Sequence, residues 1–473
     1  MCEIGLSVEL ITLAPCFLLL WCRVRSREHA AAKSPTMAWL TLIALFLCPS
    51  ITSGFGGSSI FGSPVAVPHR ARSSASSTKC QRHRHHSHLS MKIKCGVVGL
   101  PNVGKSTLFN ALAKRSLAES ANFPFCTIDP NVAPIAIPDQ YLEPLGVLAN
   151  SRRTVPATIE FVDVAGLVKG ASCGEGLGNK FLATIRECDC IVHVVRTFED
   201  GNTIHVDGKV EPLADAEVVN LELLLADLAH VERRLDKSSC QGEEREALEM
   251  AMDCLEKGVP ARSAGLSQTQ AKAIKSMGLL TLKPVIYAFN VDEVDFFLSR
   301  DDVLREAKDV VKSLQYSDDT SSLCTIVSAK VEAELSATSH DEQVEYLSSL
   351  GVELEDGSDG SIMDMLSYNV LPLQVMELLD LSLCYTGPGV PPERSQTTKA
   401  HVFRQAQELT AVGLASKLHG TIEKGFIRAE LISAPELLEY PNHVEAKESG
   451  KVRVEGKDYT LNPSDVVLIK WRE

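Results

Sequence analysis

A glycine-rich loop near residue 100 has the residue types that bind phosphate. It follows the β-branched run Ile93–Val98, and its spacing is Gly99, then Gly104, Lys105 and Ser106 before a helical pattern. Glycines let successive backbone N–H groups surround an anion at a helix N-terminus, where the lysine reaches phosphates and the serine hydroxyl takes a Mg²⁺ position. This context predicts a phosphate-binding loop. The alternative is a turn that only joins a strand to a helix.

Two further segments carry groups for a metal and for the terminal phosphate. The predicted strand from Thr158 ends in Asp-x-x-Gly, where Asp163 can hold Mg²⁺ through water and the Gly166 amide can sense a γ-phosphate. A polar-aromatic loop over 122–130 places Thr127 beside the nucleotide. The glycine-rich stretch 167–178 is predicted to be a switch that orders when nucleotide binds, or else an uncoupled surface loop.

A later strand delivers the residues that would read the base. Guanine specificity normally uses Asn-Lys-x-Asp; this chain has Asn290, then Val291 for the lysine and Glu293 for the aspartate. A longer carboxylate would crowd guanine, whereas an adenine amino group can meet other acceptors, so the pattern favours ATP over GTP. Ser328 lies in a loop where a backbone amide can approach the purine.

The predicted site residues fall into three groups. Lys105, Asp163 and Gly166 are assigned to catalysis, and Ser106 and Thr127 to the metal, with Mg²⁺ as the cofactor. The nucleotide-binding group lies along the phosphate loop and the base segments and consists of Asn102, Val103, Gly104, Lys105, Ser106, Thr107, Asn290, Val291, Glu293 and Ser328. His193, between apolar neighbours, is predicted to be a core histidine.

Charge is distributed unevenly along the chain. The 473 residues have a formal net charge of −14, and the first 90 carry nine Lys/Arg against three acidic residues, which leaves −20 for residues 91–473. So acidic a body does not bind nucleic acid through a broad positive field, since phosphate contacts need clustered positive charge. The fourteen cysteines contain no C-x-x-C pair, which favours scattered thiols over a zinc or disulfide framework.

Residues 1–90 are predicted to be a leader. Two apolar runs, Ile11–Cys22 and Ala38–Cys48, suit a signal-peptide core better than a membrane span, and no acidic residue occurs from 29 to 117. This order resembles the bipartite plastid presequence of algae with secondary plastids, and no membrane segment is expected in the mature protein. The alternatives are a secretory or mitochondrial signal, or a spurious extension with Met91 as the true start and a cytoplasmic protein.

Alternating strands and helices from Met91 predict an α/β domain over 91–375, a P-loop parallel sheet with helices on both faces. An inserted helical segment spans about 212–280, with apolar residues at helical spacing in Leu213–Leu235 and Glu243–Leu255. An internal antiparallel hairpin is favoured over a dimerisation arm because the link between the helices is short.

Residues 376–473 are predicted to form a small α+β domain of short strands, one of them at 407–410, and one helix. From Lys399 onward this domain is electrically neutral, which makes it the candidate RNA-facing surface; a solvated face of mixed charge is the alternative. Its plausible contacts share positive charge and are Lys424, Arg428, Lys451, Arg453 and Lys457.

Together these motifs resemble the Obg-like ATPase family, also called YchF, over essentially all of 91–473. The specific marks are Asn102 in the phosphate loop, Asn122–Thr127, the run from Asp163 to Ser172, Asn-x-x-Glu from Asn290, and Gly425–Glu430. The resemblance implies an OBG-type G domain with a coiled-coil insertion, a β-grasp domain of the TGS type, ATP hydrolysis in preference to GTP, and association with ribosomes. It also implies that Asn102 holds a monovalent cation such as K⁺.

The expected activity is slow nucleotide hydrolysis by a ribosome-associated switch. Leu167 stands directly after Asp-x-x-Gly, where many GTPases place the glutamine that orients water. A leucine cannot hydrogen-bond that water. The alternatives are a GTPase of the Obg type and a ribosome-binding regulatory module in which hydrolysis is incidental.

Overall fold

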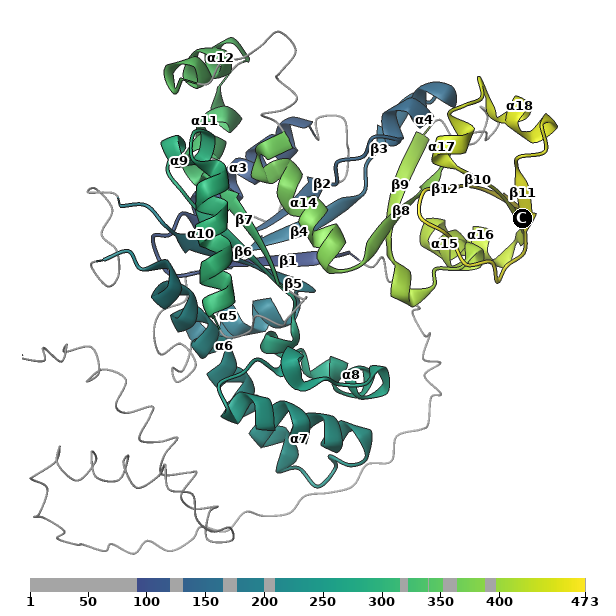
Figure 1. Cartoon of the computed structure of the whole chain (residues 1–473). Coiled ribbons are helices and arrows are strands. Elements are labelled where there is room, and N and C mark those ends of the chain that lie inside the picture. Colours follow the sequence, from purple (N-terminus) through teal and green to yellow (C-terminus); the bar gives the residue numbers. More distant parts are fainter. Residues whose placement is uncertain are drawn as a thin grey trace, which may run out of the picture. The chain divides into compact units, whose positions relative to one another are not determined.

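The computed structural model describes residues 92–119, 131–164, 177–199, 209–314, 322–338, 340–351, 364–387 and 397–472 (Figure 1). The predicted leader, residues 167–176 of the predicted switch, Thr127 and Gly166 lie outside these ranges, and the last two residues of the predicted switch, Leu177 and Gly178, begin a helix. Within them, no helix combines the length and the hydropathy needed to cross a bilayer.

The first sheet has six strands in the order β2-β4-β1-β5-β6-β7. Five of them are parallel: β1 (Lys94–Val98), β4 (Thr158–Asp163), β5 (Cys190–Arg196), β6 (Val285–Asn290) and β7 (Ser322–Val327). The sixth, β2 (Val132–Ala136), runs antiparallel to β4, so the prediction of an all-parallel sheet is wrong at this edge. The chain between β2 and β4 passes through a strand of the second sheet and not through a crossover helix over this one, so β2 and β4 can pair antiparallel.

Two groups of helices cover this sheet. The first group comprises α3 (Lys105–Glu119), α11 (Ala329–Ala337) and α14 (Ser367–Leu378). α3 packs against α11 and α14, and both α3 and α14 contact strands of the sheet. In the second group, α6 (Pro212–Leu235) contacts β5 and α10 (Arg300–Ser313), which lies against β7 (Figure 1). α5 (Leu177–Arg186), α9 (Glu293–Phe297) and α12 (His340–Ser349) complete the domain. The central strands β1, β5 and β6 are almost entirely buried, as strands covered on both faces should be.

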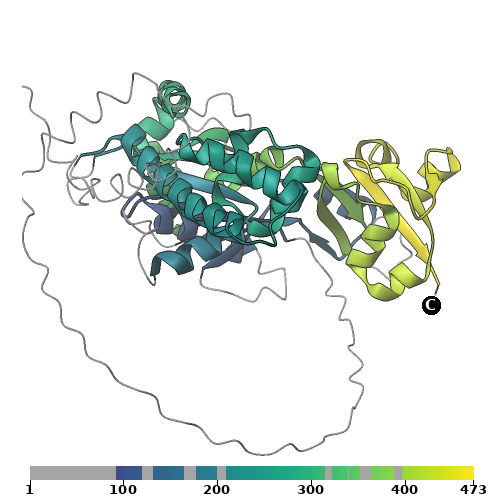
Figure 2. The same ribbon diagram turned by 90° about the horizontal axis from the view of Figure 1, so that it is seen from below.

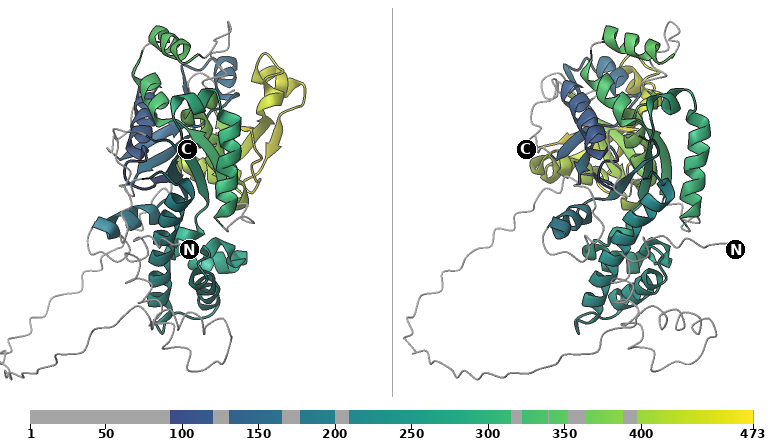
Figure 3. Two further views of the ribbon diagram at one scale, coloured as in Figure 1. Left: turned by 60° about the vertical axis from the view of Figure 1, so that its left-hand side comes forward. Right: turned by 90° about the vertical axis from the view of Figure 1, so that its left-hand side faces the viewer.

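The segment from α6 onward builds a hydrophobic cluster of its own. α6 packs on α7 (Glu243–Glu256), which contacts η4 (Ala261–Ala264) and α8 (Gln268–Ile274); η5 (Lys275–Met277) and η6 (Leu280–Leu282) lead back to β6. Figure 3 shows these teal helices grouped at one end of the sheet. Both predicted helices are confirmed to within a residue. Apolar side chains such as Leu228, Leu248 and Leu255 fill the space between them.

A second six-stranded sheet contains the C-terminal residues, in the order β11-β10-β12-β8-β9-β3. Figure 2 shows the C-terminal strands and helices in yellow and light green. Its strands are β8 (Leu381–Thr386), β9 (Thr397–Arg404), β10 (Phe426–Ser433), β11 (Arg453–Glu455), β12 (Asp465–Trp471) and, from the N-terminal half, β3 (Arg153–Val155). The accompanying helices are α15 (Ala411–Leu418), α16 (Gly420–Lys424), α17 (Ala434–Leu437) and α18 (His443–Glu448). The prediction of a single helix is therefore wrong. So is the predicted strand at 407–410, where the chain forms the 3-10 turn η7 (Gln405–Gln407) and one isolated bridge.

The β2–β4 connection joins the two sheets. It contains α4 (Leu142–Leu148) and β3, which pairs in parallel with β9. The Tyr385 hydroxyl donates to Asp139 Oδ1 at 2.9 Å, and Arg404 Nη2 lies 2.5 Å from Asp189 Oδ1. Residue 376, the predicted start of the C-terminal domain, lies inside α14, which contacts β8.

Candidate nucleotide site

The phosphate loop leaves the carboxyl end of β1 and ends where α3 begins, at Lys105. Its backbone needs glycine at two places: Gly99 has φ 153° and Gly104 has φ 94°. A Cβ on Gly99 would lie 2.4 Å from the Val194 carbonyl oxygen, which no real side chain tolerates. Asn102, at φ 61°, is a non-glycine residue in the left-handed region. The loop is thus a tightly specified turn at a helix N-terminus.

Three side chains donate to carbonyl oxygens of this loop, one from the loop's own end and two from the ends of other strands. Lys105 Nζ lies 2.5 Å from Leu100 O, and Asn290 Nδ2 lies 2.9 Å from Val103 O. Arg196 Nη1 lies 3.4 Å from Asn102 O. Since the carbonyls are engaged by the protein, the loop amides are left to face an anion.

Ser106 and Asp163 meet at the mouth of the loop. Ser106 Oγ donates to Asp163 Oδ2 at 3.1 Å, and Ser106 is exposed. Asp163 Oδ1 is buried and has no hydrogen-bond partner in the described part of the chain. A buried carboxylate oxygen with unused lone pairs next to a serine hydroxyl fits the oxygen ligands that Mg²⁺ prefers.

Burial shifts the ionisation of both charged groups in the site. It lowers the pKa of Lys105 to about 8, and the nearby Asp163 opposes this shift. Burial also raises the pKa of Asp163, while the hydrogen bond from Ser106 and the charge of Lys105 act in the other direction. A bound polyphosphate would supply negative charge beside the Lys105 ammonium, and its metal would supply positive charge beside the Asp163 carboxylate.

Asn290 links the phosphate loop to the loop that ends β7. Its Nδ2 donates to Val103 O, and its Oδ1 accepts from Ala329 N at 2.9 Å. Both side-chain ends therefore bind the protein backbone, which makes Asn290 a brace between two loops. A Cβ on Gly104 would lie 2.4 Å from Asn290 Nδ2, so this contact also explains the second glycine.

The other predicted base residues occupy different surroundings. Glu293 forms an ion pair with Lys330, directly after Ser328 and Ala329. Val291 is 2% exposed and packs with Phe296, and its N–H donates to Val327 O at 2.9 Å. Ser328 is fully buried, and its hydroxyl has no partner among the described residues. The structure brings Asn290, Glu293 and Ser328 to one edge of the sheet, since β6 and β7 end side by side.

Sequence reasoning missed Arg196. It is the last residue of β5, is 1% exposed, and stands opposite Asn290 in the strand pairing. The available signal was a charged residue that closes an otherwise apolar strand. His193, on the same strand, is 2% exposed and lies against Tyr287, with ring centroids 5.3 Å apart, as expected of a core histidine.

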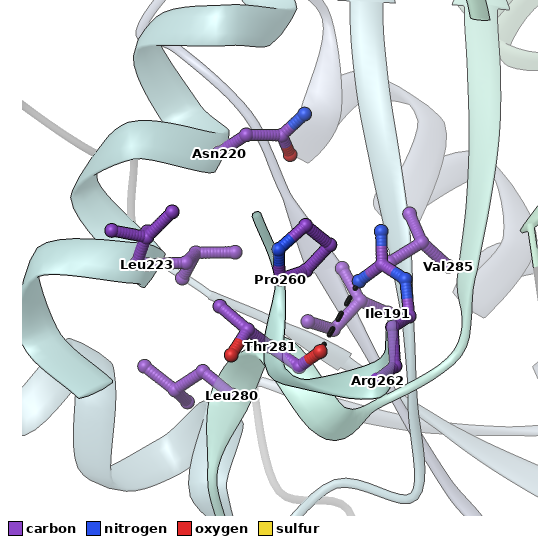
Figure 4. Close-up of a pocket in the computed structure, with 9 residues that line it drawn as sticks. Ile191, Asn220, Leu223, Pro260, Arg262, Leu280, Thr281 and Val285 are labelled. Carbon is purple, nitrogen blue, oxygen red and sulfur yellow. Dashed lines mark hydrogen bonds between the residues drawn. The ribbon is translucent and has the colours of Figure 1, made fainter. Parts of the chain in front are cut away.

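A separate small pocket lies between α6, η4 and η6 and the first residues of β5 and β6 (Figure 4). Arg262 Nη1 donates to Thr281 O at 3.4 Å across it, and Asn220 is bonded to the Tyr287 hydroxyl. The pocket is at the amino ends of the strands, whereas the phosphate loop is at the carboxyl end of β1. Ligands of parallel α/β sheets bind outside the carboxyl ends of the strands, so this pocket is not the nucleotide site.

Three of the five basic side chains predicted to face RNA form ion pairs with acidic residues of the same chain. Arg453 contacts buried Asp465 at 3.3 Å, and Arg428 contacts buried Glu430 at 3.4 Å. Lys451 contacts Glu436 at 3.2 Å. About half of each basic side chain is still exposed, so these groups face solvent as well as their acids.

Known proteins match both halves of the chain. A sequence profile described as "50S ribosome-binding GTPase" matches residues 94–227, and a profile for the YchF GTPase C-terminal region matches 395–472. A protein of Bacillus subtilis named "Ribosome-binding ATPase YchF" is 41% identical over 391 residues, which are 80% of this chain and 100% of that protein. The chain belongs to the YchF family. Its Escherichia coli O157:H7 relative of the same name is 43% identical over 387 residues, 80% of this chain and 98% of that protein.

A solved YchF structure has the same fold. The Schizosaccharomyces pombe YchF GTPase superposes with a TM-score of 0.65 at 30% identity, covering 80% of this chain and 98% of that one. The chain is thus a P-loop nucleoside triphosphate hydrolase of the YchF family, built on mixed α/β sheets.

Proposed function

We propose that the chain binds and slowly hydrolyses ATP, in preference to GTP, as a ribosome-associated switch. The observation that carries this proposal is the phosphate loop, whose carbonyls are held by Lys105, Arg196 and Asn290 so that its amides can meet a polyphosphate. The names of the bacterial relatives, "Ribosome-binding ATPase YchF", support the nucleotide and the partner.

The ATP preference rests on Glu293. An aspartate at this position would be short enough to accept two hydrogen bonds from the guanine edge, whereas the longer Glu293 carboxylate forms an ion pair with Lys330. Val291 stands where guanine-specific proteins carry a lysine, and its side chain is buried away from any ligand. Both features weaken guanine recognition and leave adenine acceptable.

Mg²⁺ is the proposed metal, held by Ser106 and Asp163, with Thr127 as a further ligand. When bound, Mg²⁺ neutralises charge on the phosphates. Lys105 orients the phosphates, and Asn102 is the proposed ligand of a monovalent cation. Because Leu167 replaces a water-orienting glutamine, we expect turnover to be slow.

The finer domain assignments are part of the proposal. We assign 91–375 to an OBG-type G domain with a coiled-coil hairpin at about 212–280, and 376–473 to a TGS-type β-grasp domain that contacts ribosomal RNA. We also propose that residues 1–90 are a plastid-targeting leader; N-terminal sequencing of the protein from its native cells checks this, and an N-terminus at Met1 contradicts it.

Turnover of ATP and GTP by the full chain tests the enzymatic proposal. Lys105→Ala should abolish turnover, while Lys114→Ala, an exposed lysine on the same helix, should leave it unchanged. Equal kcat/KM for the two purines would refute the ATP preference, and turnover that survives Lys105→Ala would refute the site.

Ribosome co-sedimentation tests the proposed partner surface. Lys424→Glu combined with Lys457→Glu should weaken co-sedimentation, whereas Lys92→Glu, an exposed lysine of the first domain, should not. Unchanged binding by the double variant would remove the C-terminal domain from the contact.

A further inference from the structure

A buried arginine lies behind the phosphate loop. Arg196 ends β5, and its guanidinium donates to two backbone carbonyls at once: Nε to Phe198 O at 2.9 Å and Nη1 to Asn102 O at 3.4 Å. The guanidinium carbon also lies 4.8 Å from the centre of the Phe198 ring. These contacts hold one planar group between the end of a strand and the middle of the loop.

The contact with Asn102 fixes the direction of a peptide plane. In a trans peptide the carbonyl and the following N–H point in opposite directions. A donor that holds Asn102 O therefore turns the Val103 N–H away from Arg196, toward the side of the loop on which an anion binds. Asn290 acts in the same way one residue later, because its bond to Val103 O orients the Gly104 N–H.

The two braces come from adjacent strand ends. Arg196 and Asn290 are paired residues of β5 and β6, and Thr197 N donates to Asn290 O at 3.1 Å. Together they orient two consecutive amides of the loop. The Asn102 backbone, at φ 61°, is in the left-handed region, which asparagine adopts more readily than other non-glycine residues, and the contact from Arg196 adds to what holds it there.

We propose that Arg196 is a positioning residue for phosphate binding: it presents the Val103 amide to the β-phosphate of a nucleoside di- or triphosphate. This role rests on the proposed nucleotide-binding function. A lysine cannot replace it fully, because an ammonium group is a point donor and lacks the planar fork that reaches two carbonyls in fixed directions.

The test compares the affinity gained from a second phosphate. We would titrate the full chain and its variants with AMP and with ADP by calorimetry. The quantity compared is the Kd for AMP divided by the Kd for ADP. For Arg196→Met this ratio should fall about tenfold relative to the unmodified chain, and for Arg196→Lys by a smaller factor. A general loosening of the fold weakens the binding of both AMP and ADP and leaves the ratio of their Kd values unchanged.

Arg186 provides the matched control. Its guanidinium is also partly buried and donates to a backbone carbonyl, Gly278 O at 3.1 Å. However, Arg186 is the last residue of α5 and contacts the helical insertion, not the phosphate loop. Arg186→Met and Arg186→Lys should leave the AMP/ADP ratio unchanged. An equal fall in the Arg186 variants, or an unchanged ratio in Arg196→Lys and Arg196→Met, overturns the positioning role.

The two levels of the proposal fail differently. If the unmodified chain binds ADP and the ratio does not respond to Arg196, only the positioning role is wrong. If the unmodified chain binds no adenine or guanine nucleotide, the proposed function is wrong and the positioning role with it. Should Arg196→Met fail to fold, Arg196→Lys retains the charge and decides the question.

Discussion

Lys105 Nζ lies 2.5 Å from the carbonyl oxygen of Leu100, so the phosphate-loop lysine binds the loop's own backbone. The next residue is Pro101, which has no N–H, so this peptide offers only an acceptor. A carbonyl is a weaker partner for an ammonium group than a phosphate is. The lysine is therefore placed where it can exchange one acceptor for the other when nucleotide enters.

Nucleotide affinity should fall as the pH rises above 8. Burial lowers the pKa of Lys105 to about 8 in the free protein, whereas bound phosphates favour the charged form. Binding above pH 8 must then take up a proton, and Kd for ADP should rise roughly tenfold per pH unit until the pKa of the complex is reached. Calorimetry from pH 7 to 9.5, in buffers of different ionisation enthalpy, measures both the slope and the proton uptake.

Lys105→Arg is the control, since a guanidinium stays charged over this range. The Lys105→Arg variant should bind ADP more weakly than the unmodified chain at pH 7, but its Kd should not change with pH. A Kd of the unmodified chain that does not change between pH 7.5 and 9.5 would contradict the assignment of this titration to Lys105.

Gly104→Ala should weaken nucleotide binding more than its backbone conformation alone predicts. The added Cβ would lie 2.4 Å from Asn290 Nδ2 and would push the brace away from Val103. We expect at least a tenfold rise in Kd for ADP and a lower free energy of unfolding.

Gly258→Ala isolates the clash from the strain of a positive φ. Gly258 has φ 76° and nothing within 4 Å of an added Cβ, so its substitution should cost about 1 kcal/mol of stability and leave Kd unchanged. Equal effects of the two substitutions on binding would show that Asn290 does not brace the loop.

Local sequence patterns were sufficient for much of the first domain. β5, α6 and α7 were predicted to within a residue or two because their apolar periodicity is local and unbroken. The P-loop residues were placed correctly for the same reason: one strand, one glycine-rich turn and one helix follow each other without interruption. Such elements need no long-range information.

Contacts between distant segments were not predictable. β3 has three residues, and it becomes a strand only because Thr397 to Lys399 lie beside it, more than 240 positions later in the chain. The sequence places Asn290 at the end of a strand, but spacing cannot tell that its amide donates to Val103 O and accepts from Ala329 N. Spacing locates a residue and says little about which atoms it meets.

Asp227→Ala should destabilise the helical insertion strongly. This carboxylate has no exposed surface and accepts from Leu280 N at 3.0 Å, Thr281 N at 2.7 Å and the Thr281 hydroxyl at 2.8 Å. Arg186 Nη1 lies 3.4 Å away. Removing the acceptor leaves these donors unpaired and one charge without its partner, so we expect a loss of about 3–5 kcal/mol in urea unfolding.

Asp253→Ala is the matched control on α7. Asp253 is 66% exposed and pairs with Lys257 one turn away, at 2.6 Å, and such pairs contribute only about 0.3–0.5 kcal/mol. If the two alanine variants unfold at the same urea concentration, the buried acid does not anchor the insertion.

Acid should destabilise the fold through two buried histidines. Burial lowers the pKa of His193 and of His401 to about 3, with smaller contributions from Lys105 at the first and from Lys399 and Lys417 at the second. Between the unfolded value near 6.5 and these folded values, the unfolded chain binds more protons than the folded one. Stability is therefore lost as the pH falls below about 6.5, at roughly 1.4 kcal/mol per pH unit for each histidine.

Urea unfolding at pH 7, 6 and 5 measures this slope. The Thr386 hydroxyl lies 2.9 Å from His401 Nε2, and the glutamine in His401→Gln can keep this hydrogen bond. His401→Gln should lower the number of protons taken up on unfolding by one, and His193→Gln should lower it by one more. If neither buried substitution flattens the pH dependence, the protons taken up on acid unfolding belong to other groups, such as carboxylates or His230, whose pKa burial also lowers to about 4, and both His193 and His401 must already be charged or accessible in the folded chain.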